Sequence, residues 1–240
     1  MNMSLSDWEV NSDLPALNWS LDLSTPIVST GSLLTEYTNS TANGTLNALP
    51  TAANIDFPEG FTAGKLRTIF KIKEFQGTYA PYVSCIGIAA MQRSRNITGS
   101  DDPSKTFYAM IVRLPEGLNP AGVLLKILKI HTSGYRSLQY VANADVLATM
   151  LYPVTLTVGS VGTLEFQWIS DIPNLNGVYL IARTGTMTDY SDLTTQLTAI
   201  DFTSPLTITV GEGPFVTLYN YTSTDLKQIT FDDTTLYSLT

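Results

Sequence analysis

Residues 64–72 read Gly-Lys-Leu-Arg-Thr-Ile-Phe-Lys-Ile, and apolar and charged side chains alternate along this stretch. One side of the extended chain carries Leu66, Thr68, Phe70 and Ile72, and the other side carries Lys65, Arg67, Lys71 and Lys73. A period of two is typical of a β-strand with one buried side and one solvent-facing side. Residues 162–169, Gly-Thr-Leu-Glu-Phe-Gln-Trp-Ile, alternate in the same way. An amphipathic strand is therefore predicted over residues 64–75 and another over residues 162–169.

Short apolar stretches separated by Gly, Pro, Asn and Asp follow along the rest of the chain. They predict further strands at residues 18–23, 82–91, 107–114, 154–158, 177–182, 197–202, 206–210, 215–221 and 228–231. Residues 123–131 fit a strand and a short helix equally. Residues 138–151 are rich in Ala and Leu, which predicts the one helix of the chain. Many short strands with turn residues between them favour a sandwich or a barrel. The sequence has no fixed-period repeat of the kind that would indicate a propeller.

The composition fits one large all-β domain or two small ones. Of the 240 residues 44% are hydrophobic, which is enough to build a core and excludes a disordered polymer. Only 14% are charged, against about 25% in ordinary globular proteins. Two interpretations of this low charge stay open. The surface packs against other copies of the chain, or it is simply polar and uncharged.

The charges are unevenly distributed around a net charge of −8. Residues 1–64 hold seven acids and no Lys or Arg, and residues 137–240 hold ten acids and two bases. Residues 65–136 hold eleven bases and four acids. This basic stretch fits contact with acidic surfaces of neighbouring copies, weak contact with a nucleic acid, or an ordinary solvated strand face.

Residues 1–60 predict an extended N-terminal arm, because their apolar residues show no sustained period and four prolines block long helices. A β-sandwich domain is then expected over residues 61–240. Asp7 and Glu9 stand where a signal peptide would have bases, and no run of about 18 uncharged apolar residues occurs. We therefore expect no membrane partner. A chain with one cysteine must fold without an internal disulfide, which fits an intracellular site of synthesis.

The residue types that most enzymes of this size use are scarce, with one histidine, His131, and one cysteine, Cys85. His131 has no acid nearby, so a structural or surface role is favoured over a catalytic triad. Cys85 is expected to be a small buried hydrophobic residue. A zinc site usually needs three or four His or Cys ligands. Gly211-x-Gly213 lacks the third glycine of a dinucleotide loop and suits a hairpin. We predict no catalytic, cofactor-binding or metal-binding residue and no enzyme activity.

Carboxylates are the remaining candidates for chemistry. Glu165 stands beside Phe166 and Trp168, a composition found in sugar sites, and a glycosidase needs only two acids. The ordinary alternative, which we favour, is an amphipathic strand whose aromatic residues point inward while Glu165 points outward. The pairs at residues 101–102 and 232–233 are Asp-Asp and offer hard oxygens for Ca²⁺, but neither has the spacing of a calcium loop.

An extended polar arm before an acidic, Thr-rich β-domain with a single cysteine resembles the jelly-roll capsid proteins of small icosahedral viruses. Residues 64–72 look like the strand that opens the jelly roll in picorna-like capsid subunits. Residues 162–169 are similar to the strand that closes the shell domain in nodavirus-like and tombusvirus-like coats. The picorna-like resemblance fits better, because the other two families usually carry a basic arm. In the layout of the nodavirus-like and tombusvirus-like coats, residues 173–240 would form a projection.

The resemblance implies an eight-stranded jelly-roll sandwich that self-associates, with sister chains, into an icosahedral shell around a genome. The implied partners are copies of itself, sister capsid proteins and a host receptor, and the implied location is the virion, assembled in the host cytoplasm. On this hypothesis, deleting residues 1–48 leaves a soluble domain that cannot assemble. The alternative is a phage or bacterial adhesin or tail module that binds carbohydrate through a β-sandwich.

Overall fold

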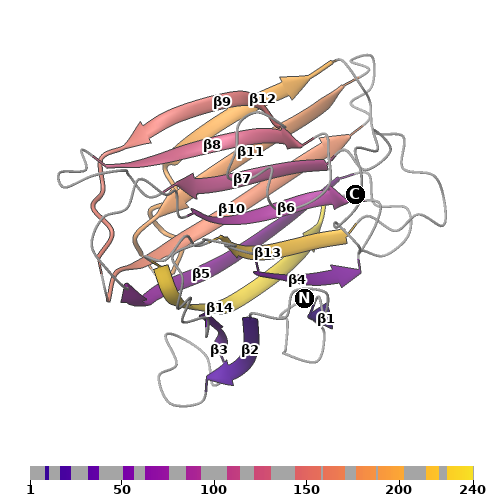
Figure 1. Cartoon of the computed structure of the whole chain (residues 1–240). Coiled ribbons are helices and arrows are strands. Elements are labelled where there is room, and N and C mark those ends of the chain that lie inside the picture. The colour runs from indigo at the N-terminus through magenta and orange to yellow at the C-terminus, as the bar shows by residue number, and fades with distance from the viewer. Residues whose placement is uncertain are drawn as a thin grey trace.

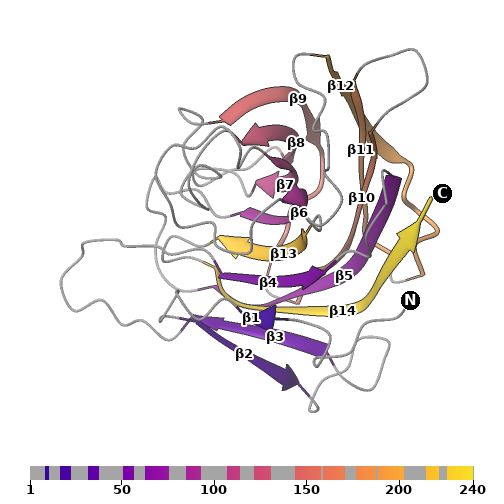
Figure 2. The same cartoon turned by 90° about the vertical axis from the view of Figure 1, so that its right-hand side faces the viewer.

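Two antiparallel β-sheets of seven strands each face one another in the computed structural model of the chain (Figures 1 and 2). The residues that the structure describes are 9–10, 17–22, 32–37, 51–56, 63–75, 85–92, 107–113, 122–130, 144–157, 159–170, 177–187, 189–202, 215–221 and 226–239. None of the described residues forms a helix with the length and apolar character needed to cross a membrane.

The first sheet, called sheet A, has the strand order β12-β11-β10-β5-β14-β3-β2, and the second, sheet B, has the order β1-β4-β13-β6-β7-β8-β9. The strands of sheet A are β2 (Leu17–Asp22), β3 (Ser32–Tyr37), β5 (Ala63–Phe75), β10 (Val161–Ser170), β11 (Val178–Gly185), β12 (Thr195–Asp201) and β14 (Leu226–Ser238). The strands of sheet B are β1 (Glu9–Val10), β4 (Thr51–Asp56), β6 (Cys85–Gln92), β7 (Phe107–Arg113), β8 (Val123–Ile130), β9 (Ala144–Tyr152) and β13 (Phe215–Tyr221).

The prediction of an all-β sandwich of the jelly-roll type is confirmed. The described residues form fourteen strands and not the eight that were expected: four strands from residues 9–56 lie at the edges of the two sheets, and residues 63–238 form ten. β4 pairs with β13 and β1 in sheet B, while β3 pairs with β14 and β2 in sheet A. The boundary between an arm and a domain at residue 60 stays a prediction.

The core lies between the two sheets and comes from the alternation seen in the sequence. Leu66, Phe70 and Ile72 of β5 and Leu164, Phe166 and Trp168 of β10 are fully buried, whereas Lys65, Arg67 and Lys71 are only partly buried. Sheet B contributes apolar side chains from β6, β7 and β8, among them Ile88, Met110 and Leu125. The strands predicted from residues 64–72 and 162–169 are confirmed, and they pair with each other in register.

The helix predicted over residues 138–151 is wrong, because the described part of this stretch forms strand β9. β9 pairs with β8 and inserts a bulge near Leu147, after which Ala148, Met150 and Tyr152 pack against the core. Pairing with β8 and partial burial of one side outweigh the local helix propensity of Ala and Leu. The strand predicted at residues 154–158 is also absent from residues 153–157. Pro153 has no N–H to donate to a ladder and follows directly after β9.

The C-terminal third of the chain belongs to the sandwich. β11, β12 and β14 extend sheet A on both sides of β10 and β5, and β13 lies inside sheet B. This arrangement contradicts the nodavirus-like layout, in which residues 173–240 would form a separate projection. The strand predicted at residues 206–210 lies outside the described residues.

Candidate functional site

The outer face of sheet A, the side turned away from the core, carries a row of polar side chains across four neighbouring strands. Arg67 of β5 pairs with Glu165 of β10, Glu165 pairs with Arg183 of β11, and Arg183 pairs with Gln196 of β12. Residues at paired positions of adjacent strands lie on the same face of a sheet. The register of these strands therefore places the four side chains in one line, although Arg67 and Gln196 are 129 positions apart in the sequence.

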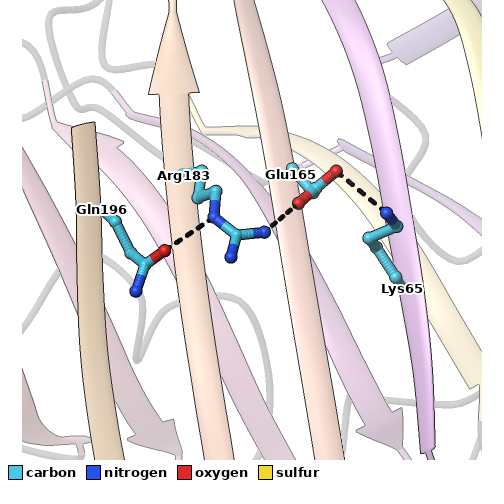
Figure 3. A network of polar contacts seen from close by, with 4 residues as sticks. All are labelled: Lys65, Glu165, Arg183 and Gln196. Carbon is cyan, nitrogen blue, oxygen red and sulfur yellow. Dashed lines mark hydrogen bonds and ion pairs between the residues drawn. The ribbon is translucent and has the colours of Figure 1, made fainter. Parts of the chain in front are cut away.

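Glu165 is the centre of this row (Figure 3). Its Oε2 lies 3.3 Å from Nζ of Lys65, and its Oε1 accepts a hydrogen bond from Nη1 of Arg183 at 2.5 Å. Arg183 also donates from Nε to Oε1 of Gln196 at 2.8 Å. The Glu165 side chain is only 5% exposed, whereas Lys65 and Arg183 keep 22% and 25% of their side-chain surface exposed. The carboxylate is thus engaged on both oxygens, and the two cations reach the surface.

Arg67 contacts the faces of two tyrosine rings at one end of the row. Its guanidinium carbon is 4.3 Å from the ring centre of Tyr190 and 4.9 Å from that of Tyr237, and Nζ of Lys65 is 4.8 Å from the Tyr237 ring. Stacking of a cation on a ring face is favourable. Among the described residues, no group accepts a hydrogen bond from the buried Arg67 Nε. The site therefore presents a cation fixed by aromatic rings and with unused hydrogen-bonding capacity.

The loop between β11 and β12 brings Tyr190 over the sheet. Asp192 holds this loop, because its carboxylate accepts hydrogen bonds from the backbone N–H of Thr186 at 2.5 Å and of Met187 at 3.0 Å. Tyr190 adopts a left-handed backbone with φ of 61°, which is uncommon for a non-glycine residue. Its hydroxyl donates to the backbone oxygen of Asp233 at 2.8 Å. Burial raises the pKa of Tyr190, so the hydroxyl stays neutral.

Four neighbouring strands of sheet A carry more positive than negative charge on their outward side, although the chain is acidic. On the described, outward-pointing positions of β5, β10, β11 and β12, the charged side chains are Lys65, Arg67, Lys71, Arg183 and Glu165. Four cations and one carboxylate leave a local excess of positive charge, while the whole chain carries −8. Such a face attracts an anionic partner.

The structure separates the residues that the sugar-site interpretation of β10 had grouped. Glu165 points to the outer face, while Phe166 and Trp168 are buried in the core with ring centres 6.2 Å apart. The preferred interpretation of an amphipathic strand is confirmed. His131, residues 101–102 and Gly211-x-Gly213 lie outside the described residues, as does the side chain of Cys85. In the part of the chain that the structure describes, no three His, Cys, Asp or Glu side chains gather as metal ligands would.

Sequence reasoning missed Arg183, Gln196, Tyr190 and Tyr237 as members of the site. A signal for Arg183 exists, since Glu165 and Arg183 have opposite charges on outward positions of consecutive strands. Tyr190 and Tyr237 gave no such signal, because one lies in a loop and the other on β14 at the far end of the sequence.

The comparisons with known proteins find structural but not sequence relatives. No protein-family model and no curated protein matches the chain. An endo-beta-1,4-glucuronan lyase from the fungus Trichoderma reesei has a TM-score of 0.55 at 11% identity, covering 99% of this chain and 93% of its own. An alginate lyase from Aplysia kurodai has a TM-score of 0.52 at 10% identity, covering 93% and 87%. The carbohydrate recognition domain of Emp46p has a TM-score of 0.51 at 11% identity, covering 98% and 89%. Identities this low show a shared fold alone.

Proposed function

We propose that this chain is a carbohydrate-binding β-sandwich that holds an acidic polysaccharide on the outer face of sheet A. The observation that carries the proposal is Arg67, which contacts the rings of Tyr190 and Tyr237 and has a buried Nε that no described residue engages. The fold is also that of two polysaccharide lyases and a carbohydrate recognition domain. These likenesses support the class of ligand but do not identify it.

The chemistry of the row suits sugars that carry carboxylate groups. Guanidinium groups bind carboxylates through paired hydrogen bonds, and tyrosine rings offer flat apolar area with a polar edge. Gln196 uses its amide oxygen to accept from Arg183, which leaves the amide nitrogen to donate to a sugar hydroxyl. We propose binding without bond cleavage, because the Glu165 carboxylate on this part of the face already forms ion pairs with Lys65 and Arg183.

Calorimetric titration of the full chain with oligosaccharides tests this function. We expect binding to alginate or polyglucuronate oligosaccharides, weakening as salt is added, and no binding to neutral cellulose oligosaccharides. Arg67→Gln should weaken binding about 10-fold or more, because a charged hydrogen bond to the ligand is lost. Lys126→Gln removes the same charge from β8 of the opposite sheet and should leave binding unchanged. Equal binding to neutral sugars, or equal losses in both variants, would contradict the proposal.

We also propose, as a second function, the self-assembling coat protein that the sequence resemblance implies. One observation favours self-association. Ile200 and Phe202, at the edge of sheet A, are 43% and 58% exposed, which is large for apolar side chains on a free strand edge. Electron microscopy with light scattering across pH and salt separates the two functions. Closed particles would support the coat protein with copies of itself as partners, whereas a monomer under all conditions would count against it.

A further inference from the structure

Three polar side chains meet inside the sandwich, away from the outer face of sheet A. Nζ of Lys129 on β8 lies 2.6 Å from Oδ2 of Asp201, the last residue of β12. The hydroxyl of Tyr108 on β7 donates to the same Oδ2 at 2.7 Å. The side chains of Lys129 and Asp201 are 5% and 4% exposed, and Tyr108 is fully buried. The contact joins sheet B to sheet A through their side chains.

The position of Lys129 is notable, because Val123, Leu125 and Ile127 precede it on the inward side of β8 and are all buried in the core. An apolar residue would continue this pattern. A buried ion pair gains little stability over apolar packing, because both charges must leave water. Nζ of Lys129 and Oδ2 of Asp201 are close enough, at 2.6 Å, for a proton to pass between them inside the core.

We propose that Lys129 and Asp201 condense into an intramolecular amide, an isopeptide bond, after the chain has folded. Proton transfer within the pair gives a neutral amine and a carboxylic acid. The lone pair of Nζ attacks Cγ of Asp201, and a C–N bond forms. The C–Oδ2 bond breaks, and Oδ2 leaves as water with its own proton and one from Nζ. One amine and one acid become one amide and one water, and no oxidant or other reactant is required.

Tyr108 is the catalytic residue of this step, because its hydroxyl touches the oxygen that leaves. Burial and the hydrogen bond to Asp201 raise the pKa of Tyr108, so the hydroxyl keeps its proton. A hydrogen bond to Oδ2 draws electron density from Cγ and stabilises the charge that develops on Oδ2 as the C–O bond breaks. The surrounding core excludes bulk water, which would hydrolyse the amide or solvate the amine.

The bond would provide a covalent link that cysteine chemistry does not offer this chain. The sequence holds one cysteine, so no internal disulfide forms. An amide between Lys129 and Asp201 would close a long loop and tie β12, an edge strand of sheet A, to the opposite sheet. Closing a loop lowers the entropy of the unfolded chain and stabilises the fold.

Intact-mass spectrometry of the unfolded full chain tests the proposal. The wild-type protein, purified after folding and incubation, should weigh less than its sequence by one water molecule. Lys129→Arg keeps the charge but should show the full sequence mass and a Tm lower by roughly 5–15 °C. Asp201→Asn should lose one ammonia instead of water if it reacts, and Tyr108→Phe should react more slowly. Lys126→Arg, on the outward side of β8, is the control and should lose water as the wild type does.

Peptide mapping completes the test by locating the link. A proteolytic fragment that joins the segments around Lys129 and Asp201 is expected from the wild type and from Lys126→Arg, and not from Lys129→Arg. A wild-type mass equal to the sequence mass, before and after incubation, would show an ordinary ion pair and overturn the proposal. A water loss that persists in Lys129→Arg would lie elsewhere in the chain and would overturn it too.

Discussion

At the scale of single residues, the side chains that point inward could be predicted from the sequence, but the partners of the outward ones could not. Alternation places Glu165 outside and Trp168 inside, and both positions are observed. The contacts of Glu165 with Lys65 and Arg183 depend on the register of three strands, which alternation does not determine. The place of Tyr190 depends on a loop whose shape follows from hydrogen bonds to Asp192.

Gly162 offers a test at this scale, because it lies opposite Phe70 in the pairing of β10 with β5. A Cβ at Gly162 would overlap the Phe70 ring, which is itself buried in the core. Gly162→Ala should therefore lower the free energy of unfolding by about 1–3 kcal/mol, the usual cost of overpacking. Urea denaturation measures this, with the exposed Thr198→Ala as control. An unchanged midpoint would mean that the ring has room to move.

Asp192 predicts a dependence of stability on pH. Burial acts to raise its pKa, but the hydrogen bonds from Thr186 and Met187 outweigh this, so the pKa lies below its ordinary value. A carboxyl with a lowered pKa stabilises the fold fully above its unfolded-state pKa, and the stabilisation is lost as the pH falls through the folded-state pKa. Asp192→Asn should thus lower Tm at neutral pH, and the difference from wild type should shrink in acid. A difference that is constant across pH would contradict this role.

At the scale of elements, the sequence predicts strands well where the pattern is strictly amphipathic and poorly at the edges of the sheets. β5 and β10 were predicted because burial on one side produces alternation. β9 was predicted as a helix because this edge strand is largely exposed and its bulge breaks the alternation. Edge strands and bulges have weak patterns, since fewer of their side chains are buried.

Deleting residues 1–48 tests the contribution of the N-terminal strands. The deletion removes β1, β2 and β3, which are the outer strands at one end of the two sheets (Figure 1). β14 loses β3 but keeps β5, and β4 keeps β13, so a folded sandwich with a lower Tm is expected. Circular dichroism with thermal melting measures both. A spectrum without cooperative melting would show that these strands are required for folding.

At the scale of the whole molecule, a two-layer β-sandwich could be predicted, but the order of its strands could not. β5 pairs with β14, and β4 pairs with β13, which joins segments from opposite ends of the chain. Such long-range pairings leave no local trace in the sequence. For the same reason a separate projection of residues 173–240 fitted the sequence, although these residues complete both sheets.

The shared core predicts a single unfolding transition. Side chains from residue 66 to residue 231 pack into one cluster between the sheets. Differential scanning calorimetry of the full chain should therefore show one peak, with calorimetric and van't Hoff enthalpies in agreement. Two separated peaks would indicate that parts of the chain unfold independently, as a shell with a projecting domain would.

The contact of Lys129 and Tyr108 with Asp201 also bears on how the two sheets are aligned with each other. Apolar contacts are non-directional, so they distinguish one lateral alignment of the two sheets from another less sharply than a hydrogen bond does. A buried charge needs a specific partner atom. If one sheet were shifted by a single residue, the charge would lose that partner and be surrounded by apolar side chains. The contact among Lys129, Tyr108 and Asp201 therefore favours one lateral alignment of the two sheets, with or without a covalent bond.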